Sequence, residues 1–138
     1  MINDKIIYKT DIAIVSYSKE RELVTTVWNS KKVTFKEYQE PFLAAIEFQK
    51  KVFVSNYISD IREQYIIPPE FRKWFQTEIL PKAYAAGVKR SAIIFNGNVF
   101  KKYYLNNIMN SVKKFGAPIK FFSTMEEAHI WLESFDKK

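Results

Sequence analysis

The sequence predicts a single α/β domain over residues 1–138, with a mixed sheet, an antiparallel hairpin at its N-terminal end and helices packed on the sheet. Two observations support this fold class. Short runs rich in β-branched and aromatic residues alternate with longer stretches whose apolar residues recur at helical spacing. The run Lys51–Arg62, KVFVSNYISDIR, has no helical period and lies between two helical stretches. It then stops on polar residues, which is typical of a buried strand.

Three strands are predicted near the N-terminus. Lys5–Lys9, Asp11–Tyr17 and Glu22–Trp28 are short, rich in β-branched and aromatic residues, and separated by polar residues such as the turn SKER. Alternation of apolar and polar residues with a period of two indicates strands exposed on one face. We therefore expect an antiparallel meander or hairpin here.

A helix is predicted next, because Thr34 and Glu37 have the spacing of a capping box and apolar residues follow at helical spacing. Pro41 is awkward inside this helix, since it lacks a backbone N–H and its ring clashes with the preceding turn. Two interpretations stay open: the helix bends at Pro41, or a short turn leads into a helix that starts there.

The following strand, Lys51–Ile58, is predicted to be internal, with neighbours on both sides. Phe53 and Val54 are expected to be buried in it. Truncating either to alanine should then cost about 2–5 kcal/mol of stability.

The second half of the chain continues the alternation. Pro68-Pro69-Glu70 predicts a helix start. Pro81 is expected to end this helix and open a short second one, which Gly87 closes. Arg90–Phe95 is predicted to be a buried parallel strand.

Asn96-Gly97-Asn98 then predicts a turn, and Phe100 to Phe115 a helix. The last strand is Ile119–Phe122, and the spacing of Thr124 and Glu127 predicts a second capping box before the last helix. The expected order is βββ-α-β-α-β-α-β-α, with the later strands parallel and right-handed crossovers.

Composition excludes several kinds of site. There is no cysteine, which excludes disulfides, thiolate metal sites and a cysteine nucleophile, and His129 is the single histidine. Neither a dinucleotide fingerprint nor a P-loop is present. A catalytic set would have to use His129, which lies far along the chain from any serine in a nucleophile-elbow context. We therefore predict no catalytic residues, no metal and no cofactor.

The chain has 22 Lys and Arg against 15 Asp and Glu, a net charge of +7. Such a balance can indicate nucleic acid or an anionic membrane surface. The basic residues occur as scattered doublets, so a solvated basic surface is the preferred interpretation. No segment reaches the roughly eighteen apolar residues that span a bilayer, and no signal peptide is recognisable. A cytoplasmic protein is expected.

Polar residues end several predicted strands or open the following loops. If the later strands are parallel, these side chains converge at the carboxyl ends, where α/β sheets usually hold ligands. We expect a partly apolar cleft there, with Asp60 and Arg62 at its mouth. The alternative is that these two form a structural ion pair. The candidate ligand- or partner-binding residues are Trp28, Ser59, Asp60, Arg62, Asn96 and Asn98.

Five passages together resemble the STAS/SEC14-like family, whose members include SpoIIAA-like domains similar to the sporulation anti-sigma-factor antagonists. They read WNSKKVTFKEY, YISDIR, IIPPEFRKW, AGVKRSAIIF and FSTMEEAHIWL, and the resemblance that rests on them extends over most of the chain. The resemblance implies a SpoIIAA-like β/α superhelical fold and a binding or regulatory role instead of catalysis.

One departure from that family concerns phosphorylation. The antagonists carry a phosphorylatable serine in an Asp-Ser-Ser/Thr-Gly turn after the central strand. Here the corresponding passage is Ser59-Asp60-Ile61-Arg62, which lacks the glycine and the motif order. We therefore expect no regulated state that needs phosphate on Ser59.

The leading hypothesis is a non-enzymatic cytoplasmic regulatory or interaction domain that acts through protein contacts or a small apolar or anionic ligand. The partner is an unknown protein or small molecule, and a homodimer is left open. The first alternative is a small enzyme with a pocket at the carboxyl ends of the strands. The third hypothesis, ranked below both, is a nucleic-acid binder whose Lys101–Tyr104 passage (KKYY) stacks on bases.

Overall fold

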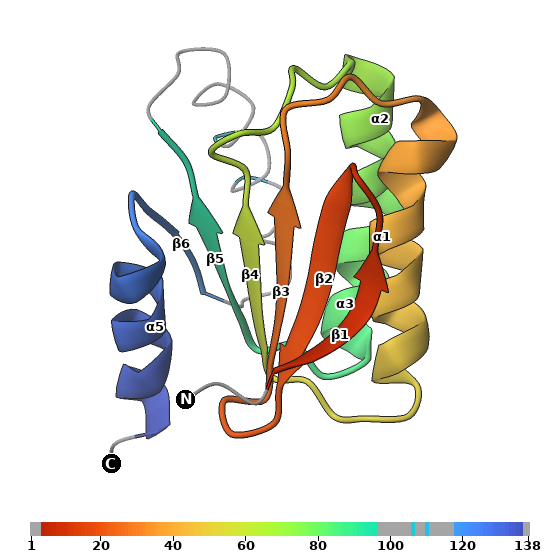
Figure 1. The fold of residues 1–138 in the computed structure, drawn as a ribbon. Coiled ribbons are helices and arrows are strands. Elements are labelled where there is room, and N and C mark those ends of the chain that lie inside the picture. The colour runs from red at the N-terminus through yellow and green to blue at the C-terminus, as the bar shows by residue number, and fades with distance from the viewer. Residues whose placement is uncertain (1–3, 97–105, 107–109, 111–117, 137–138) are drawn as a thin grey trace.

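The protein folds around one six-stranded sheet with strand order β1-β2-β3-β4-β5-β6 (Figure 1). The structure is a computed structural model, and it describes residues 4–96, 106, 110 and 118–136. The pairs β1–β2 and β2–β3 are antiparallel, and β3–β4, β4–β5 and β5–β6 are parallel. The predicted mixed sheet with an N-terminal hairpin is therefore confirmed. The strands are β1 Lys5–Lys9, β2 Ala13–Ser18, β3 Leu23–Trp28, β4 Asn56–Asp60, β5 Arg90–Ile94 and β6 Ile119–Phe122.

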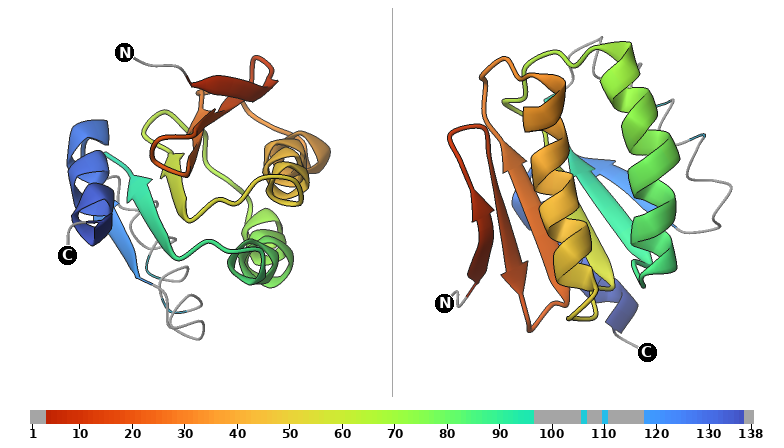
Figure 2. Two further views of the ribbon diagram at one scale, coloured as in Figure 1. Left: turned by 90° about the horizontal axis from the view of Figure 1, so that it is seen from below. Right: turned by 90° about the vertical axis from the view of Figure 1, so that its right-hand side faces the viewer.

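Helices cover both faces of the sheet. Helix α1 and the continuous helix formed by α2, η1 and α3 lie on one face, here called the α1–α3 face, whereas α5 lies on the other, the α5 face (Figure 2). The predicted helix from 100 to 115 lies, apart from Asn106 and Asn110, outside the described residues. The described helices are α1 Phe35–Gln49, α2 Pro69–Trp74, η1 Phe75–Ile79, α3 Leu80–Ala85, α5 Met125–Glu133 and η3 Ser134–Asp136.

The predicted capping box at the start of α1 is confirmed. Thr34 Oγ1 accepts a hydrogen bond from the Glu37 backbone N–H at 3.2 Å, and Glu37 Oε1 accepts one from the Thr34 N–H at 2.9 Å. Helix α1 therefore begins at Phe35 and continues through Pro41. The alternative in which the helix starts at Pro41 is wrong. The cap satisfies N–H groups that a helix leaves unpaired in its first turn.

Pro81 does not break its helix in the way predicted. Between α2 and α3 the chain makes a π-helical turn, in which the Leu80 N–H donates to the Phe75 carbonyl. In a regular α-helix the ring of Pro81 would clash with the carbonyl of Thr77, four residues earlier. The wider π turn lies directly before the proline, so the helix changes its winding instead of ending.

The predicted strand Lys51–Ile58 is wrong at its N-terminal end, because β4 runs from Asn56 to Asp60. It begins where the Glu22 carbonyl accepts the N–H groups of Ser55 and Asn56, beside the start of β3. The strand is internal, as predicted, between β3 and β5. Val54 is buried as expected, but the Phe53 side chain is 50% exposed. Ser59 therefore lies inside the strand and not beyond it.

Gly87 closes α3 as predicted. Its N–H donates to the Tyr84 carbonyl, and the Val88 N–H donates to the Ala83 carbonyl, which is the Schellman pattern. The φ of Gly87 is +130°, and a Cβ placed there would lie 2.7 Å from Cε1 of Phe53. The backbone conformation therefore favours glycine at this position, and a Cβ would in addition displace the half-exposed Phe53 ring.

Replacing Gly87 with alanine is expected to lower the free energy of unfolding by more than about 1 kcal/mol. In a Phe53→Ala background the steric contact is absent and only the backbone strain remains, so the loss should be smaller but still measurable. Urea denaturation of the unmodified protein, the two single variants and the double variant measures the backbone strain and the steric contact separately. An equal loss of unfolding free energy in both backgrounds would show that the contact with Phe53 does not matter. No loss in Gly87→Ala would contradict both constraints.

The buried apolar side chains of the described residues form three clusters, two on the α1–α3 face and one on the α5 face. The α5-face cluster packs α5 against β3, β4 and β5. It comprises Leu23, Ile58, Ala92, Ile94, Ala128 and Leu132. The α1–α3 face carries the larger aromatic side chains, among them Trp28, Tyr38 and Phe42. The sheet is therefore buried on both faces where β4 and β5 run.

Candidate functional site

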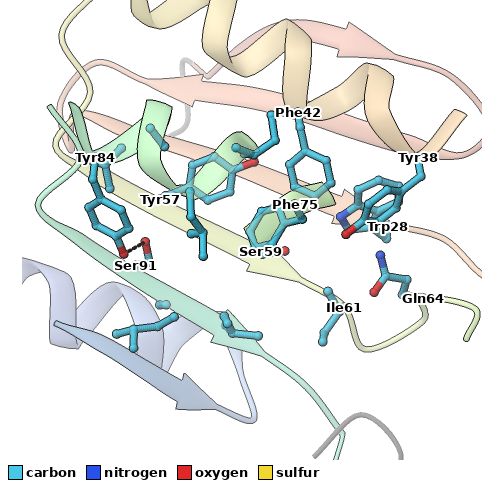
Figure 3. Close-up of a pocket in the computed structure, with 17 residues that line it drawn as sticks. Trp28, Tyr38, Phe42, Tyr57, Ser59, Ile61, Gln64, Phe75, Tyr84 and Ser91 are labelled. Carbon is cyan, nitrogen blue, oxygen red and sulfur yellow. Dashed lines mark hydrogen bonds between the residues drawn. The ribbon is translucent and has the colours of Figure 1, made fainter. Parts of the chain in front are cut away.

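A cavity of about 60 Å³ lies on the α1–α3 face, between the sheet and the helices (Figure 3). Its sheet wall includes Trp28 from β3, Tyr57 and Ser59 from β4, and Ser91 from β5. Successive side chains of a strand point to opposite faces, so Tyr57 and Ser59 reach the cavity together while Ile58 faces α5. The helix wall includes Phe42 of α1, Phe75 and Ile79 of η1, and Ala83 of α3.

Stacked and tilted rings hold one end of the cavity in place. The Trp28 ring stacks on Tyr38 with centroids 5.5 Å apart, and it lies tilted against Phe42 at 5.5 Å. Phe42 in turn contacts Phe75 of η1 at 4.9 Å. Aromatic pairs at such separations stabilise one another by about 0.5–1.5 kcal/mol beyond the area they bury. This wall is therefore well fixed, and the π turn is part of it.

Two tyrosine hydroxyls that border the cavity, those of Tyr57 and Tyr84, have hydrogen-bond partners. Tyr57 Oη lies 2.8 Å from Thr26 Oγ1, and Tyr84 Oη lies 3.1 Å from Ser91 Oγ. Burial raises the pKa of Tyr57 to about 12, although its hydrogen bond with Thr26 acts in the opposite direction. Burial also raises the pKa of Tyr84, again against its bond with Ser91. Both phenols are therefore neutral at physiological pH.

The cavity is uncharged along the walls that the structure describes. None of the described lining residues is Asp, Glu, Lys, Arg or His. Burying an ion without a counter-charge is costly, so such a cavity favours a neutral, largely apolar molecule. It also offers no described group that exchanges a proton near neutral pH, which general acid–base catalysis would need.

One polar atom in the cavity wall has no partner. Trp28 is 2% exposed, and its indole nitrogen Nε1 is buried without a hydrogen-bond acceptor among the protein groups. Leaving a buried donor unpaired costs about 1–3 kcal/mol, and buried indole N–H groups usually find a partner. The unpaired N–H is therefore a place where a ligand could contribute an acceptor.

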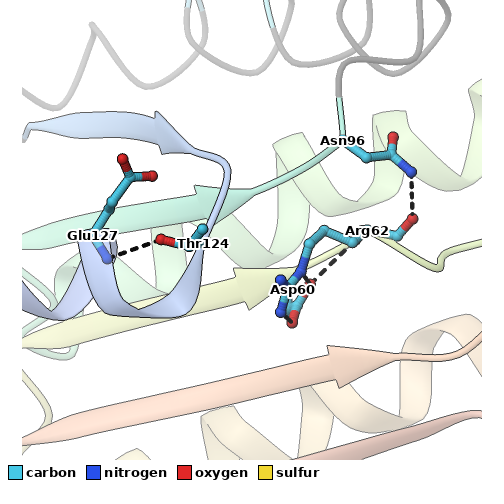
Figure 4. A network of polar contacts seen from close by, with 5 residues as sticks. All are labelled: Asp60, Arg62, Asn96, Thr124 and Glu127. Atoms are coloured by element: carbon cyan, nitrogen blue, oxygen red, sulfur yellow. Dashed lines mark hydrogen bonds and ion pairs between the residues drawn. The ribbon is translucent and has the colours of Figure 1, made fainter.

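The predicted pair Asp60–Arg62 lies elsewhere, and neither residue lines the cavity. Asp60 Oδ1 accepts from Arg62 Nε at 3.0 Å, and Oδ2 accepts from Nη2 at 2.8 Å (Figure 4). Asn96 Nδ2 donates to the Arg62 carbonyl at 2.9 Å. The Asp60 side chain is only 7% exposed, against 38% for Arg62. Hydrogen bonding to Asp60 raises the pKa of the Arg62 guanidinium.

The candidate residues thus divide into two groups. Trp28 and Ser59 line the cavity, whereas Asp60, Arg62 and Asn96 form the ion-paired network of Figure 4. The sixth candidate, Asn98, lies outside the described residues. Alternation along β4 explains the division, because Ser59 and Asp60 are neighbours and point to opposite faces.

Sequence reasoning missed most of the cavity wall. Tyr57, Phe75, Tyr84 and Ser91 all line it, yet none was a candidate. The available signal was a tyrosine followed two residues later by a serine in β4, and a serine directly before the apolar residues of β5. Small polar residues on the covered face of a strand leave room between that strand and a helix.

The described residues offer little support for a histidine-based site, a metal site or a membrane span. His129 lies on α5, on the opposite face of the sheet from the cavity, and burial together with the nearby Arg21 lowers its pKa. No group of three or more His, Asp or Glu residues in the described part of the chain could hold a metal ion. Within the same residues, no helix is long and apolar enough to cross a membrane.

We found no family model, no curated protein and no solved structure that matches the chain.

Proposed function

We propose that the protein is a non-enzymatic binding domain whose site is the cavity of the α1–α3 face, and that it takes a small, neutral, largely apolar molecule. One observation carries the proposal. The cavity is bordered by aromatic and aliphatic side chains with hydroxyl groups that are mostly paired, and no described residue of its wall is charged. Such a wall binds by shape and apolar contact.

The size of the cavity limits its occupant. An engineered apolar cavity of about 150 Å³ binds benzene or xenon, whereas this one measures about 60 Å³. It suits a molecule of a few heavy atoms, or one end of a larger molecule. Very small ligands gain at most about 1.5 kcal/mol per heavy atom. Four atoms then correspond to a dissociation constant of tens of micromolar at best, so binding has to be sought up to millimolar concentrations.

We place this binding domain in the regulatory class implied by the STAS resemblance, with a SpoIIAA-like fold and a cytoplasmic location as parts of the same proposal. The consecutive parallel strands β3 to β6, with helices between β3 and β4 and between β4 and β5, support the fold assignment. Regulation would follow from linkage, because a ligand that binds only the folded form raises its stability. No observation on the described residues favours the enzyme or nucleic-acid hypotheses, and Lys101–Tyr104 lies outside them.

The proposal is tested by binding of 2-methylpropene, a neutral hydrocarbon with four heavy atoms, followed by methyl chemical shifts. The unmodified protein should show saturable shifts. Ala83 is buried and lines the cavity, so Ala83→Leu should fill it and weaken binding at least tenfold. Ala85 is exposed on the same helix, and Ala85→Leu is the matched control with unchanged affinity.

Overpacking can itself cost about 1–3 kcal/mol, so the thermal midpoint of each variant is measured first to confirm folding. No saturable binding by the unmodified protein, either of 2-methylpropene or of acetone, a neutral molecule of the same shape, would end the proposal. Equal affinity in the two leucine variants would place the site outside the cavity.

A further inference from the structure

We infer that the ligand carries a hydrogen-bond acceptor, and that the Trp28 indole N–H is the group that recognises it. The ligand class is then a neutral carbonyl compound and not a plain hydrocarbon. This inference rests on the proposed function, since it specifies which molecule the cavity prefers.

The position of Trp28 is fixed by backbone and ring contacts. It is the last residue of β3 and pairs with Ala13 of β2, and the following Asn29 N–H donates to the Ile12 carbonyl. Stacking on Tyr38 holds the ring plane. In Figure 3 the indole nitrogen lies on the edge of the ring nearer to Phe75. The ring therefore holds the N–H in one place, where no acceptor of the described protein groups lies within hydrogen-bond distance.

The polar groups of the cavity are unevenly distributed. At the end where Tyr84 and Ser91 lie, the two hydroxyls pair with each other. At the other end, Gln64 lies near Trp28 in Figure 3, and its side chain makes no hydrogen bond to another described residue. A ligand with one polar end would thus place its acceptor toward Trp28 and its apolar part toward the η1–α3 helix.

Charge decides which acceptor fits. A carboxylate or phosphate would accept from Trp28, but no cation among the described lining residues would compensate for its charge. A ketone, ester or amide carbonyl supplies an acceptor without a net charge. A hydroxyl group on the ligand would also need an acceptor from the protein for its own hydrogen, whereas a carbonyl group has no hydrogen to donate.

The test compares acetone with 2-methylpropene, which have the same shape and differ by C=O in place of C=CH₂. Each is titrated into the unmodified protein and into Trp28→Phe, with Trp131→Phe as the matched control, because Trp131 lies on α5 across the sheet. The affinity ratio of acetone to 2-methylpropene should fall about three- to tenfold in Trp28→Phe and stay unchanged in Trp131→Phe. The net free energy of one hydrogen bond corresponds to a change in affinity of this size.

A second readout needs no variant. Acetone, but not 2-methylpropene, should move the Nε1–H resonance of Trp28 downfield, with the indole resonances of Trp74 and Trp131 as internal references. If both probes bind and neither the ratio nor the resonance changes, the inference is overturned while the binding domain stands. If neither probe binds at millimolar concentration, the proposed function fails with it.

Discussion

Replacing Ile58 with alanine is expected to lower the free energy of unfolding by about 3–4 kcal/mol, a large share of the 5–15 kcal/mol typical of a domain. Ile58 is fully buried in the central strand β4. Its side chain packs on the α5 face with Leu23, Ala92 and Leu132. Removing it leaves a cavity between a sheet and a helix that cannot easily close, because the strands on both sides fix β4.

Phe53→Ala is the comparison for this prediction. Phe53 is a larger side chain in the same stretch of sequence, but it is half exposed and lies before the strand. Its truncation should cost less than about 1.5 kcal/mol. Urea denaturation of both variants measures the difference. A larger loss for Phe53 than for Ile58 would contradict the observed start of β4.

Arg62→Ala is expected to cost about 2–3 kcal/mol. The variant leaves the Asp60 carboxylate, which is only 7% exposed, with the backbone N–H of residue 62 as its remaining partner among the described residues. Breaking a fully buried ion pair costs about 3–5 kcal/mol. Because the Arg62 side chain is 38% exposed, water reaches the pair, and the expected loss lies at or below the lower end of that range.

The control for Arg62→Ala is the double variant with Asp60→Asn, which removes the buried charge and should recover part of the lost stability. Affinity for 2-methylpropene should remain unchanged in both, since neither residue lines the cavity. A small stability loss combined with loss of probe binding would instead return Arg62 and Asp60 to the binding site.

Local sequence signals predicted most of the fold. The capping residue Thr34, the Pro-rich start of α2 and the C-terminal Gly87 act within a few residues of themselves, so their outcome can be read from the sequence. The error at Phe53 has a different origin. An apolar run shows that residues are suited to burial, but β4 begins where Glu22 of a distant segment supplies an acceptor.

The candidate site was less predictable than the fold. Asp60 and Arg62 stood out because they are charged and end an apolar run, and the structure places them in an ion pair. The cavity depends on where Trp28, Phe42 and Ala83 meet, although they are far apart in the sequence. The unpaired state of the Trp28 N–H follows from the absence of an acceptor in its surroundings. The sequence contains no pattern from which this missing acceptor could be predicted.

The location of a bound probe shows whether the cavity is the binding site. In isotope-labelled protein saturated with unlabelled 2-methylpropene, intermolecular nuclear Overhauser effects report which methyl groups lie against the probe. If the probe binds in the cavity, we expect contacts with the methyl groups of Ala83, Ile79 and Ile93, which line it. Contacts confined to exposed side chains such as Ile66 and Ile130, with none at the three cavity residues, would contradict it.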